Sequence, residues 1–409
     1  MKTEFTDNYF SRRNLAIDML RAITMLVMIF VNDLWSISDV PHWLEHAEFG
    51  EDFAGLSDFV FPCFLFVMGM SIPYAIENRY AKGLSAESTL GHILVRSFTL
   101  LIMGVFTVNS GNFADSVPYN SYVYYVLIFI AFLLIWNRYP STPSHRALWA
   151  TLRIIGCAIL IYLMVTCKHG DGSPFRASWW GILGIIGWAY LFCATTYLLL
   201  RRRPIVIAGI FAFLIVLCIT TTPLRDSFGA STILGLPEGH FISSLLGSLH
   251  IGNGCMASLT MGGVMLSLTS ARLATLSPNR RLLYGLAAAA IMLCIAIGLH
   301  QFIIVSKLGE TPTWVFYTYA IAITLYFTLN RLVELGLTRW FVIIKPAGTA
   351  TLTAYLMPYI AYGVAGLTGW HVPESLTHSA YGIIVCISFS FIMIWLAGLL
   401  GKLHIRLKI

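Results

Sequence analysis

Long apolar stretches fill most of the chain, and charged residues fall mainly between them. A helix needs about 20 apolar residues to cross a bilayer, and runs of this length indicate helices rather than strands. The breaks give candidate spans near residues 15–35, 58–76, 92–109, 121–136, 149–167, 179–200, 204–222, 247–270, 282–305, 313–330, 341–365 and 380–400. The pattern therefore predicts an all-α polytopic membrane protein with about 10–12 transmembrane helices, forming a single domain over residues 1–409.

Composition excludes a soluble protein. Of the 409 residues, 57% are hydrophobic and 11% charged, whereas about a quarter of the residues of a soluble domain are charged. The eight cysteines fall mostly inside apolar runs without CxxC spacing. We interpret them as small core residues rather than as a disulfide framework or a metal cage. His42 and His46 could share a helix face and ligate a metal, but no third ligand has suitable spacing, so no metal is expected.

The distribution of positive charge predicts the topology. If both termini are cytoplasmic, only four of the 26 Lys and Arg residues fall on the opposite side, with Arg21 inside the first span. These four are Lys168, Arg176, Arg225 and Lys307. The net charge of +7 follows from this distribution and indicates no nucleic-acid partner.

Ionisable residues inside a bilayer are costly and are candidates for function. Asp18 and Arg21 are three residues apart in the first span, so they share a helix face and can pair. They either neutralise one another near the cytoplasmic interface or help to hold a polyanionic cytoplasmic ligand, since Arg suits phosphate. His250 and Asn253 lie in a glycine-rich stretch, where they either serve packing or hold a ligand against the backbone.

The segment from Asn32 to Asp58 holds seven acidic residues and two histidines, with no Lys or Arg. It is either an ordinary outer loop without positive charge or an acceptor site. An acidic vestibule attracts a cationic amine. A carboxylate near a neutral His can also hold that His in one tautomer as a general base.

Three motifs in residues 14–72 resemble the heparan-alpha-glucosaminide N-acetyltransferase family of multi-spanning acyltransferases. They are Asn14–Asn32, reading NLAIDMLRAITMLVMIFVN, then His46-Ala47, then Asp58–Ile72, reading DFVFPCFLFVMGMSI. Pro237-Glu238-Gly239 and Lys345–Tyr355 are similar to later segments of that family. This chain departs from the family at Ala22 and at Asp33-Leu34, where the family has glycines.

The resemblance implies about ten core helices, acetyl-CoA as a cytoplasmic donor and a saccharide acceptor on the far side. It implies that His46 is catalytic, either as general base or as transient carrier of the acetyl group. Asn32 would orient the reactants or stabilise the oxyanion, and Asp58 would orient the loop or His46. The candidates for binding the coenzyme are Arg21, Asp18, His250 and Asn253.

The acceptor, the oligomeric state, the location and the class of function stay open. The acceptor group can be an amine or a hydroxyl, and a homodimer is plausible from the resemblance, as is a location in a bacterial inner membrane. A secondary transporter or a lipid-linked sugar flippase is the alternative function, because about twelve spans with both termini inside is a common transporter layout. A catalytically silent membrane subunit is a third possibility.

Overall fold

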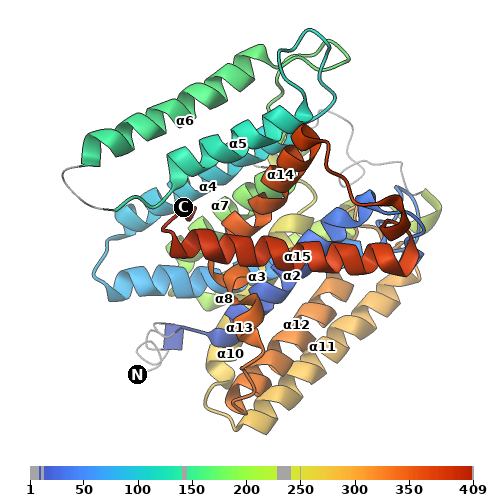
Figure 1. Ribbon diagram of the computed structural model, residues 1–409. Helices are drawn as coiled ribbons and strands as arrows, with labels where there is room; N and C mark the ends of the chain where they lie inside the picture. Colours follow the sequence, from blue (N-terminus) through green and yellow to red (C-terminus); the bar gives the residue numbers. More distant parts are fainter. Residues whose placement is uncertain (1–8, 11–12, 141–144, 228–240, 249, 408–409) are drawn as a thin grey trace. The chain divides into compact units, whose positions relative to one another are not determined.

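The computed structural model describes residues 9–10, 13–140, 145–227, 241–248 and 250–407 (Figure 1). Within these ranges the regular structure is helical, and β-pairing is limited to isolated bridges. The helices are α2 (Leu15–Asp33), α3 (Leu56–Ala81), α4 (Ala86–Val108), α5 (Ser121–Trp136), α6 (Arg146–Thr166), α7 (Ile182–Leu200), α8 (Pro204–Thr221), α9 (Phe241–Ser248), α10 (Cys255–Leu273), α11 (Pro278–His300), α12 (Pro312–Glu334), α13 (Phe341–Thr349), α14 (Thr351–Thr368) and α15 (Ser379–Lys402). The all-α prediction is confirmed, whereas Pro237-Glu238-Gly239 lies outside the described residues.

Eight of the described helices are long and apolar enough to cross a membrane, which makes this a multi-pass membrane protein. They are α2 with its extension to Ser36, α3, α4, α6, α7, α8, α11 and α15. The apolar helix α5 has only 16 residues, and α10, α12 and α14 fall outside this set. The count of 10–12 spans and the cytoplasmic termini stay predictions.

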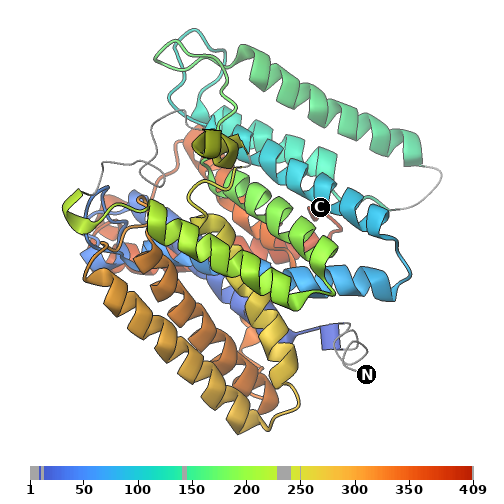
Figure 2. The same cartoon turned by 180° about the vertical axis from the view of Figure 1, so that it is seen from behind.

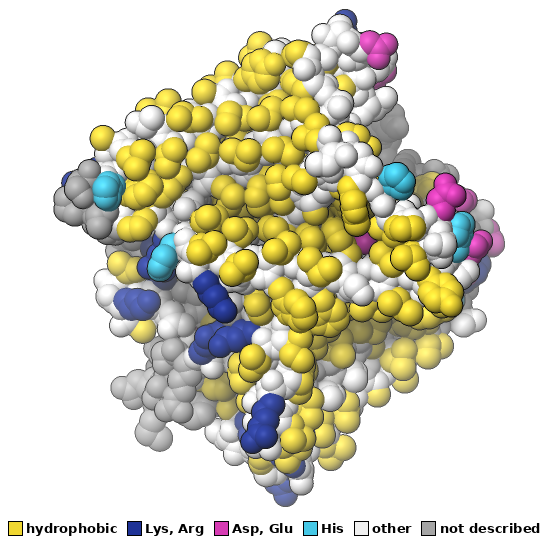
Figure 3. Space-filling model, in the orientation of Figure 1, with side chains coloured by type: hydrophobic (Ala, Val, Ile, Leu, Met, Phe, Trp, Pro, Cys, Tyr) yellow, Lys and Arg dark blue, Asp and Glu magenta, His cyan; other side chains and the backbone are white. Residues whose placement is uncertain are grey.

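Exposed apolar side chains cover the outer faces of several of these helices. On α6, the exposed fractions of Ile154, Ile161 and Val165 are 68%, 57% and 74%. Figure 3 shows hydrophobic side chains over the visible faces of α5, α6 and α15. Such surfaces are unusual in water and suit contact with lipid.

The helices group into two compact units. Unit 1 holds the described residues of Met1–Thr24, Pro41–Ser97 and Trp188–Val342, and unit 2 those of Met25–Val40, Phe98–Gly187 and Ile343–Ile409. Each unit is built from three separate stretches of chain. The expectation of a single domain over residues 1–409 stays a prediction.

In unit 1, α3 and α10 pack closely because each has a glycine at the contact. A Cβ atom on Gly263 would lie 1.9 Å from the carbonyl oxygen of Phe66, and one on Gly69 would lie 1.8 Å from that of Thr260. Small residues allow helix backbones to approach this closely. The contact holds α3, whose first turn carries Asp58, firmly against α10.

Helices α11 and α12 of unit 1 run side by side in both views (Figures 1 and 2). Pro278 and Pro312 begin them at the first helical position, where a proline costs no hydrogen bond. The connection between them is tied by a hydrogen bond from the Thr311 amide to the carbonyl of Ser306, 3.1 Å long. This connection carries Lys307.

In unit 2, α5 packs against α6 and α14, and α14 packs against α15. A Cβ atom on Gly363 of α14 would lie 2.9 Å from the carbonyl oxygen of Tyr122 in α5. The Tyr362 hydroxyl donates a hydrogen bond of 2.6 Å to Asp33 at the end of α2. Unit 2 thereby fixes the residues around the C-terminal end of α2.

Two predicted spans are broken in the structure. The stretch predicted at 247–270 contains the end of α9 at Ser248 and becomes helical again only at Cys255, because His250, Gly252 and Gly254 adopt positive φ angles of 50°, 58° and 83°. The stretch predicted at 341–365 is divided into α13 and α14 at Ala350, whose φ of −124° and ψ of 42° are not helical.

The eight cysteines are free thiols. Six are buried, as their position in apolar runs predicts, and burial raises the pKa of Cys167, which follows α6. The other two, Cys157 of α6 and Cys294 of α11, are exposed instead of being core residues. They lie on helices whose outer faces are apolar.

Candidate functional site

Asp58 organises the segment that precedes α3. It lies in the first turn of the helix and is 1% exposed. Its Oδ2 atom accepts hydrogen bonds from the backbone N–H groups of Ala47, at 3.0 Å, and Gly55, at 3.2 Å. Backbone amides and the positive end of the helix dipole both favour an ionised carboxylate here. One buried carboxylate thus ties both ends of the 47–55 stretch to α3.

His46 is bound to the other oxygen of Asp58. The distance from its Nδ1 to Asp58 Oδ1 is 2.7 Å, and its side chain is 49% exposed. An ionised carboxylate can only accept, so Nδ1 donates and the lone pair of the neutral ring remains on Nε2. Among the described residues, Nε2 has no protein partner. The ring is therefore oriented so that Nε2 can accept a proton or attack a carbonyl carbon.

Lys307 is a third member of this group; the sequence placed it among the four cations of the outer side but did not predict it as a site residue. Its Nζ lies 3.2 Å from His46 Nδ1 and 3.6 Å from Asp58 Oδ1. Since Nδ1–H and the ammonium are both donors, the ion pair with Asp58 is the favourable contact. Burial lowers the pKa of Lys307, and the carboxylate of Asp58 opposes this effect.

Asp52 attaches the segment carrying His46 to two other parts of unit 1. Its Oδ1 accepts hydrogen bonds from the Val305 amide and from Nε2 of His300, both at 2.8 Å, and its Oδ2 pairs with Arg225. Burial by itself raises the pKa of Asp52, but these hydrogen bonds and charges hold the pKa below its usual value.

His42 makes contacts of a different kind. Its Nε2 lies 3.0 Å from Oε1 of Glu51, and its ring stacks on Phe53 with centroids 4.3 Å apart. In the part of the chain that the structure describes, no three His, Cys, Asp or Glu side chains gather as a metal site would require. The contacts of His42 are therefore with Glu51 and Phe53, whereas His46 is bound to Asp58.

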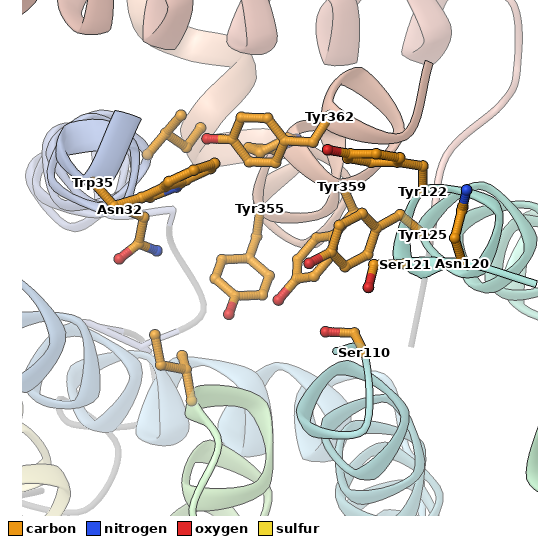
Figure 4. Close-up of a pocket in the computed structure, with 13 residues that line it drawn as sticks. Asn32, Trp35, Ser110, Asn120, Ser121, Tyr122, Tyr125, Tyr355, Tyr359 and Tyr362 are labelled. Atoms are coloured by element: carbon orange, nitrogen blue, oxygen red, sulfur yellow. The ribbon is translucent and has the colours of Figure 1, made fainter. Parts of the chain in front are cut away.

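Asn32 lies in unit 2, where it lines a pocket of about 640 Å³ (Figure 4). The lining is aromatic and polar, and none of it is acidic or basic. It consists of Ile29, Asn32, Trp35, Ser110, Asn120, Ser121, Tyr122, Tyr125, Ile182, Tyr355, Pro358, Tyr359 and Tyr362. Tyr355 and Ser110 point their hydroxyl groups toward the same space. Such a lining suits an uncharged, hydroxyl-rich ligand, because it offers ring faces and neutral donors and acceptors.

The predicted pair in the first span is present in unit 1. Arg21 Nη1 lies 3.2 Å from Asp18 Oδ1, and Arg13 Nε lies 2.5 Å from Asp18 Oδ2. Arg21 also donates a hydrogen bond to Ser71 of α3. Among the described residues, two guanidinium groups thus share the Asp18 carboxylate.

His250 and Asn253 have local roles in unit 1. The His250 ring stacks on Trp188 with centroids 3.9 Å apart. Asn253 donates a 3.0 Å hydrogen bond to the carbonyl of Glu310 and accepts one of 2.9 Å from the Cys255 amide. These contacts support the packing interpretation, and a coenzyme role for the two residues stays a prediction.

The rarity of positive charge in the predicted outer loops was the available signal for Lys307 and Arg225. Three of the four cations assigned to that side pair with acidic residues: Arg176 with Asp171, Arg225 with Asp52, and Lys307 with Asp58. At the first of these pairs, hydrogen bonds from Ser173 and the charge of Arg176 lower the pKa of Asp171 to about 2. Three of the four cations predicted for the outer side of this chain are therefore paired with acidic groups.

Comparison with known proteins identifies a family to which the sequence is similar. The sequence matches the family described as "Domain of unknown function (DUF5009)" over residues 13–228, more than half of the chain. The chain belongs to the DUF5009 family. The matched range includes α2, α3 and the His46–Asp58 pair, whereas Lys307 lies beyond it.

The chain is also similar to heparan-alpha-glucosaminide N-acetyltransferase from human, with 34% identity over 95 residues, and from mouse, with 33% over 94. Each alignment covers 23% of this chain and only 13% of the relative. These identities indicate a distant relationship, and the chain spans a small part of the length of the curated relatives that it matches.

Proposed function

We propose that this protein is an integral-membrane acetyltransferase. It would take the acetyl group from cytoplasmic acetyl-CoA and transfer it to an amine or hydroxyl of a saccharide on the far side of the membrane. The observation that carries the proposal is the hydrogen bond between His46 and Asp58, which leaves Nε2 of a half-exposed imidazole as the available base. The distant likeness to enzymes named as N-acetyltransferases supports the reaction class.

Two routes are consistent with the His46–Asp58 pair. In direct transfer, Nε2 takes the proton from the acceptor as its N or O atom attacks the thioester carbonyl; the C–S bond breaks, and the imidazolium returns the proton to the CoA thiolate. In stepwise transfer, Nε2 attacks the thioester carbonyl, the C–S bond breaks, and CoA leaves as the thiolate while the acetyl group stays on Nε2. The N or O atom of the acceptor then attacks the acetyl carbon, the bond to Nε2 breaks, and the acceptor loses its proton to solvent, from which the thiolate is protonated. In both routes Asp58 holds the ring and stabilises the positive charge that develops on it.

The uncharged pocket of unit 2 supports a saccharide as the acceptor. Pyranose rings stack on aromatic faces, and Asn32, whose amide makes no hydrogen bond to the described residues, can bind sugar hydroxyls. Arg21, paired with Asp18, would serve the polyanionic coenzyme. A bacterial inner membrane and a homodimeric state complete the proposal.

The experiment compares purified wild-type protein with His46→Gln in detergent, using acetyl-CoA and glucosamine. Free CoA and acetylated sugar are quantified by mass spectrometry, because the exposed thiols of Cys157 and Cys294 would react with thiol reagents. We expect His46→Gln to lose at least about a hundredfold in rate, the scale of a general base. The matched control is His42→Gln, which changes a neighbouring exposed histidine and should keep the wild-type rate.

A folded His46→Gln variant with wild-type transfer would overturn the catalytic assignment. Calorimetry tests the donor separately, with acetyl-CoA and free CoA titrated into the monodisperse wild-type protein. Micromolar binding supports the acetyltransferase. Failure of both to bind would favour the transporter or flippase alternative.

A further inference from the structure

Lys307 reaches the His46–Asp58 pair from a rigid connection between α11 and α12. The Ser306 amide donates a hydrogen bond of 3.0 Å to the Thr311 hydroxyl. The Gly309 amide donates one of 3.0 Å to the Ser306 hydroxyl. Thr313 of α12 donates to the Ile303 carbonyl at 2.9 Å. Lys307 itself is 21% exposed at its side chain. Its ammonium is therefore placed by a structured turn and not by chance contact of a flexible surface side chain.

His46 and Lys307 compete for one carboxylate oxygen of Asp58. Asp58 Oδ1 lies 2.7 Å from His46 Nδ1 and 3.6 Å from Lys307 Nζ, and the two nitrogens are 3.2 Å apart. An Asp alone would stabilise the imidazolium and raise the pKa of its His partner. A cation beside the same carboxylate offsets this attraction and repels a second positive charge on the ring.

The other charged groups near His46 in the described part of the chain contact other residues. In the segment with His46, Glu45 and Glu51 contact His42, Asp52 contacts Arg225 and His300, and Glu48 makes its hydrogen bond through its backbone amide. From the side of Lys307, Glu310 is the nearest acid in sequence, and burial raises its pKa, which disfavours a second negative charge. Asp58 and Lys307 are thus the charged groups in contact with His46 among the described residues.

We propose that Lys307 is a positioning residue that keeps the His46 imidazole neutral, with its Nε2 lone pair available, by balancing the charge of Asp58. This inference rests on the proposed function for its catalytic meaning, but the electrostatic effect can be measured without it. Removing the cation favours the protonated ring, so a smaller fraction of neutral imidazole should remain at a given pH in a variant that lacks the charge.

The test measures the titration of His46 directly. Wild-type protein, Lys307→Met and Lys307→Arg are treated briefly with diethylpyrocarbonate from pH 5 to 9, and the modified fraction of the His46 peptide is quantified by mass spectrometry. Only the neutral imidazole reacts, so the midpoint reports its pKa. We expect the midpoint in Lys307→Met to move upward by about one to three pH units, the range for one nearby charge. Lys307→Arg should remain within a few tenths of wild type.

An unchanged or lowered midpoint in Lys307→Met would overturn the proposal. Should Lys307→Met not yield monodisperse protein, Lys307→Gln removes the charge while retaining hydrogen-bonding capacity, and the same shift is expected. A purely structural role would alter the amount of folded protein but would not move the midpoint.

Kinetics then separate this inference from the proposed function. The acidic limb of kcat/KM for acetyl transfer should move upward with the chemical midpoint in Lys307→Met. If the wild-type protein transfers no acetyl group and the midpoint still shifts, the acetyltransferase proposal fails while the electrostatic role of Lys307 stands. Transfer by wild type without any shift of either curve in Lys307→Met refutes the role of Lys307 alone.

Discussion

Arg225 and Asp52, 173 residues apart in the chain, form an ion pair that fixes the segment carrying His46 within unit 1. Asp52 also binds the amide of Val305 and the ring of His300. We expect Asp52→Asn to increase the mobility of residues 41–55. The Asn side chain has no negative charge to pair with Arg225, and its NH₂ group would face one of the donors that Asp52 now binds. Hydrogen exchange measured by mass spectrometry should be faster in these residues of Asp52→Asn than in the wild type. The matched control is Glu48→Gln, which changes an exposed acidic residue of the same segment.

The same attachment gives a pH dependence with a definite sign. The pKa of Asp52 is held below its usual value in the folded protein, so its stabilising contribution is present above the unfolded value of about 3.9 and is lost as pH falls through the folded pKa. Hydrogen exchange in residues 41–55 should therefore change little from pH 7 to 5, after correction for intrinsic rates, and rise below about pH 4. Exchange in Asp52→Asn should lack this acid step.

Asp58→Asn should lower the rate of acetyl transfer more than it lowers binding of acetyl-CoA. The neutral amide can no longer stabilise a positive imidazole, and its NH₂ group would face one of the donors, His46 or the Ala47 and Gly55 amides. We expect a fall in kcat of about 10- to 100-fold, the scale for a residue that orients a reactive group, and a lower melting temperature. A kcat within twofold of wild type would mean that His46 does not depend on this carboxylate.

The contact between α3 and α10 predicts opposite effects for two glycine substitutions. Gly263→Ala should destabilise the protein by about 1–3 kcal/mol, since a Cβ would meet the Phe66 carbonyl and neither backbone can move easily. Gly209→Ala in α8 meets no atom within 4 Å and should stabilise by up to about 1 kcal/mol through helix propensity. Thermal unfolding in detergent compares them, and equal melting temperatures would contradict the packing described for α3 and α10.

The pocket of unit 2 predicts an effect confined to the acceptor. Trp35→Ala removes an exposed aromatic face at the pocket and should raise the acceptor KM about two- to tenfold, the scale of one aromatic contact. The KM for acetyl-CoA should stay unchanged. Trp180→Ala is the control, because Trp180 is exposed in unit 2 to a similar extent, 72% against 73%, but does not line the pocket. A rise in the acetyl-CoA KM alone would assign this pocket to the donor.

The apolar pattern predicted the fold class well because helix formation in a membrane depends on local composition. The 16 residues of α5 begin and end where the pattern placed them. The pattern failed where single backbone angles decide the outcome, as at Gly254 before α10 and at Ala350 between α13 and α14. The positive φ of Gly254 allows a turn that an apolar count does not register.

For the site, the sequence motifs predicted His46 and Asp58 together, because the two residues lie only 12 positions apart. The contact between Lys307 and His46 could not be predicted from a motif, since 261 residues separate the two and the residues next to Lys307 form no motif. The packing role expected for the glycine-rich stretch around His250 is present at Gly254, where a Cβ atom would lie 2.9 Å from the carbonyl oxygen of Leu214 in α8. The tighter contacts at Gly69 and Gly263 were not predicted. Long-range contacts of single residues depend on the packing of whole helices, which local patterns do not encode.

Asp58 holds its segment through the main chain of Ala47 and Gly55, and every residue except proline supplies the same N–H group. The side chains between these two anchors, apart from Asp52 with its contacts to Arg225, His300 and Val305, can therefore be exchanged during evolution without displacing His46. Residues 48–51, which are largely exposed, form a stretch in which relatives could diversify the molecules they recognise while the reactive imidazole keeps its position.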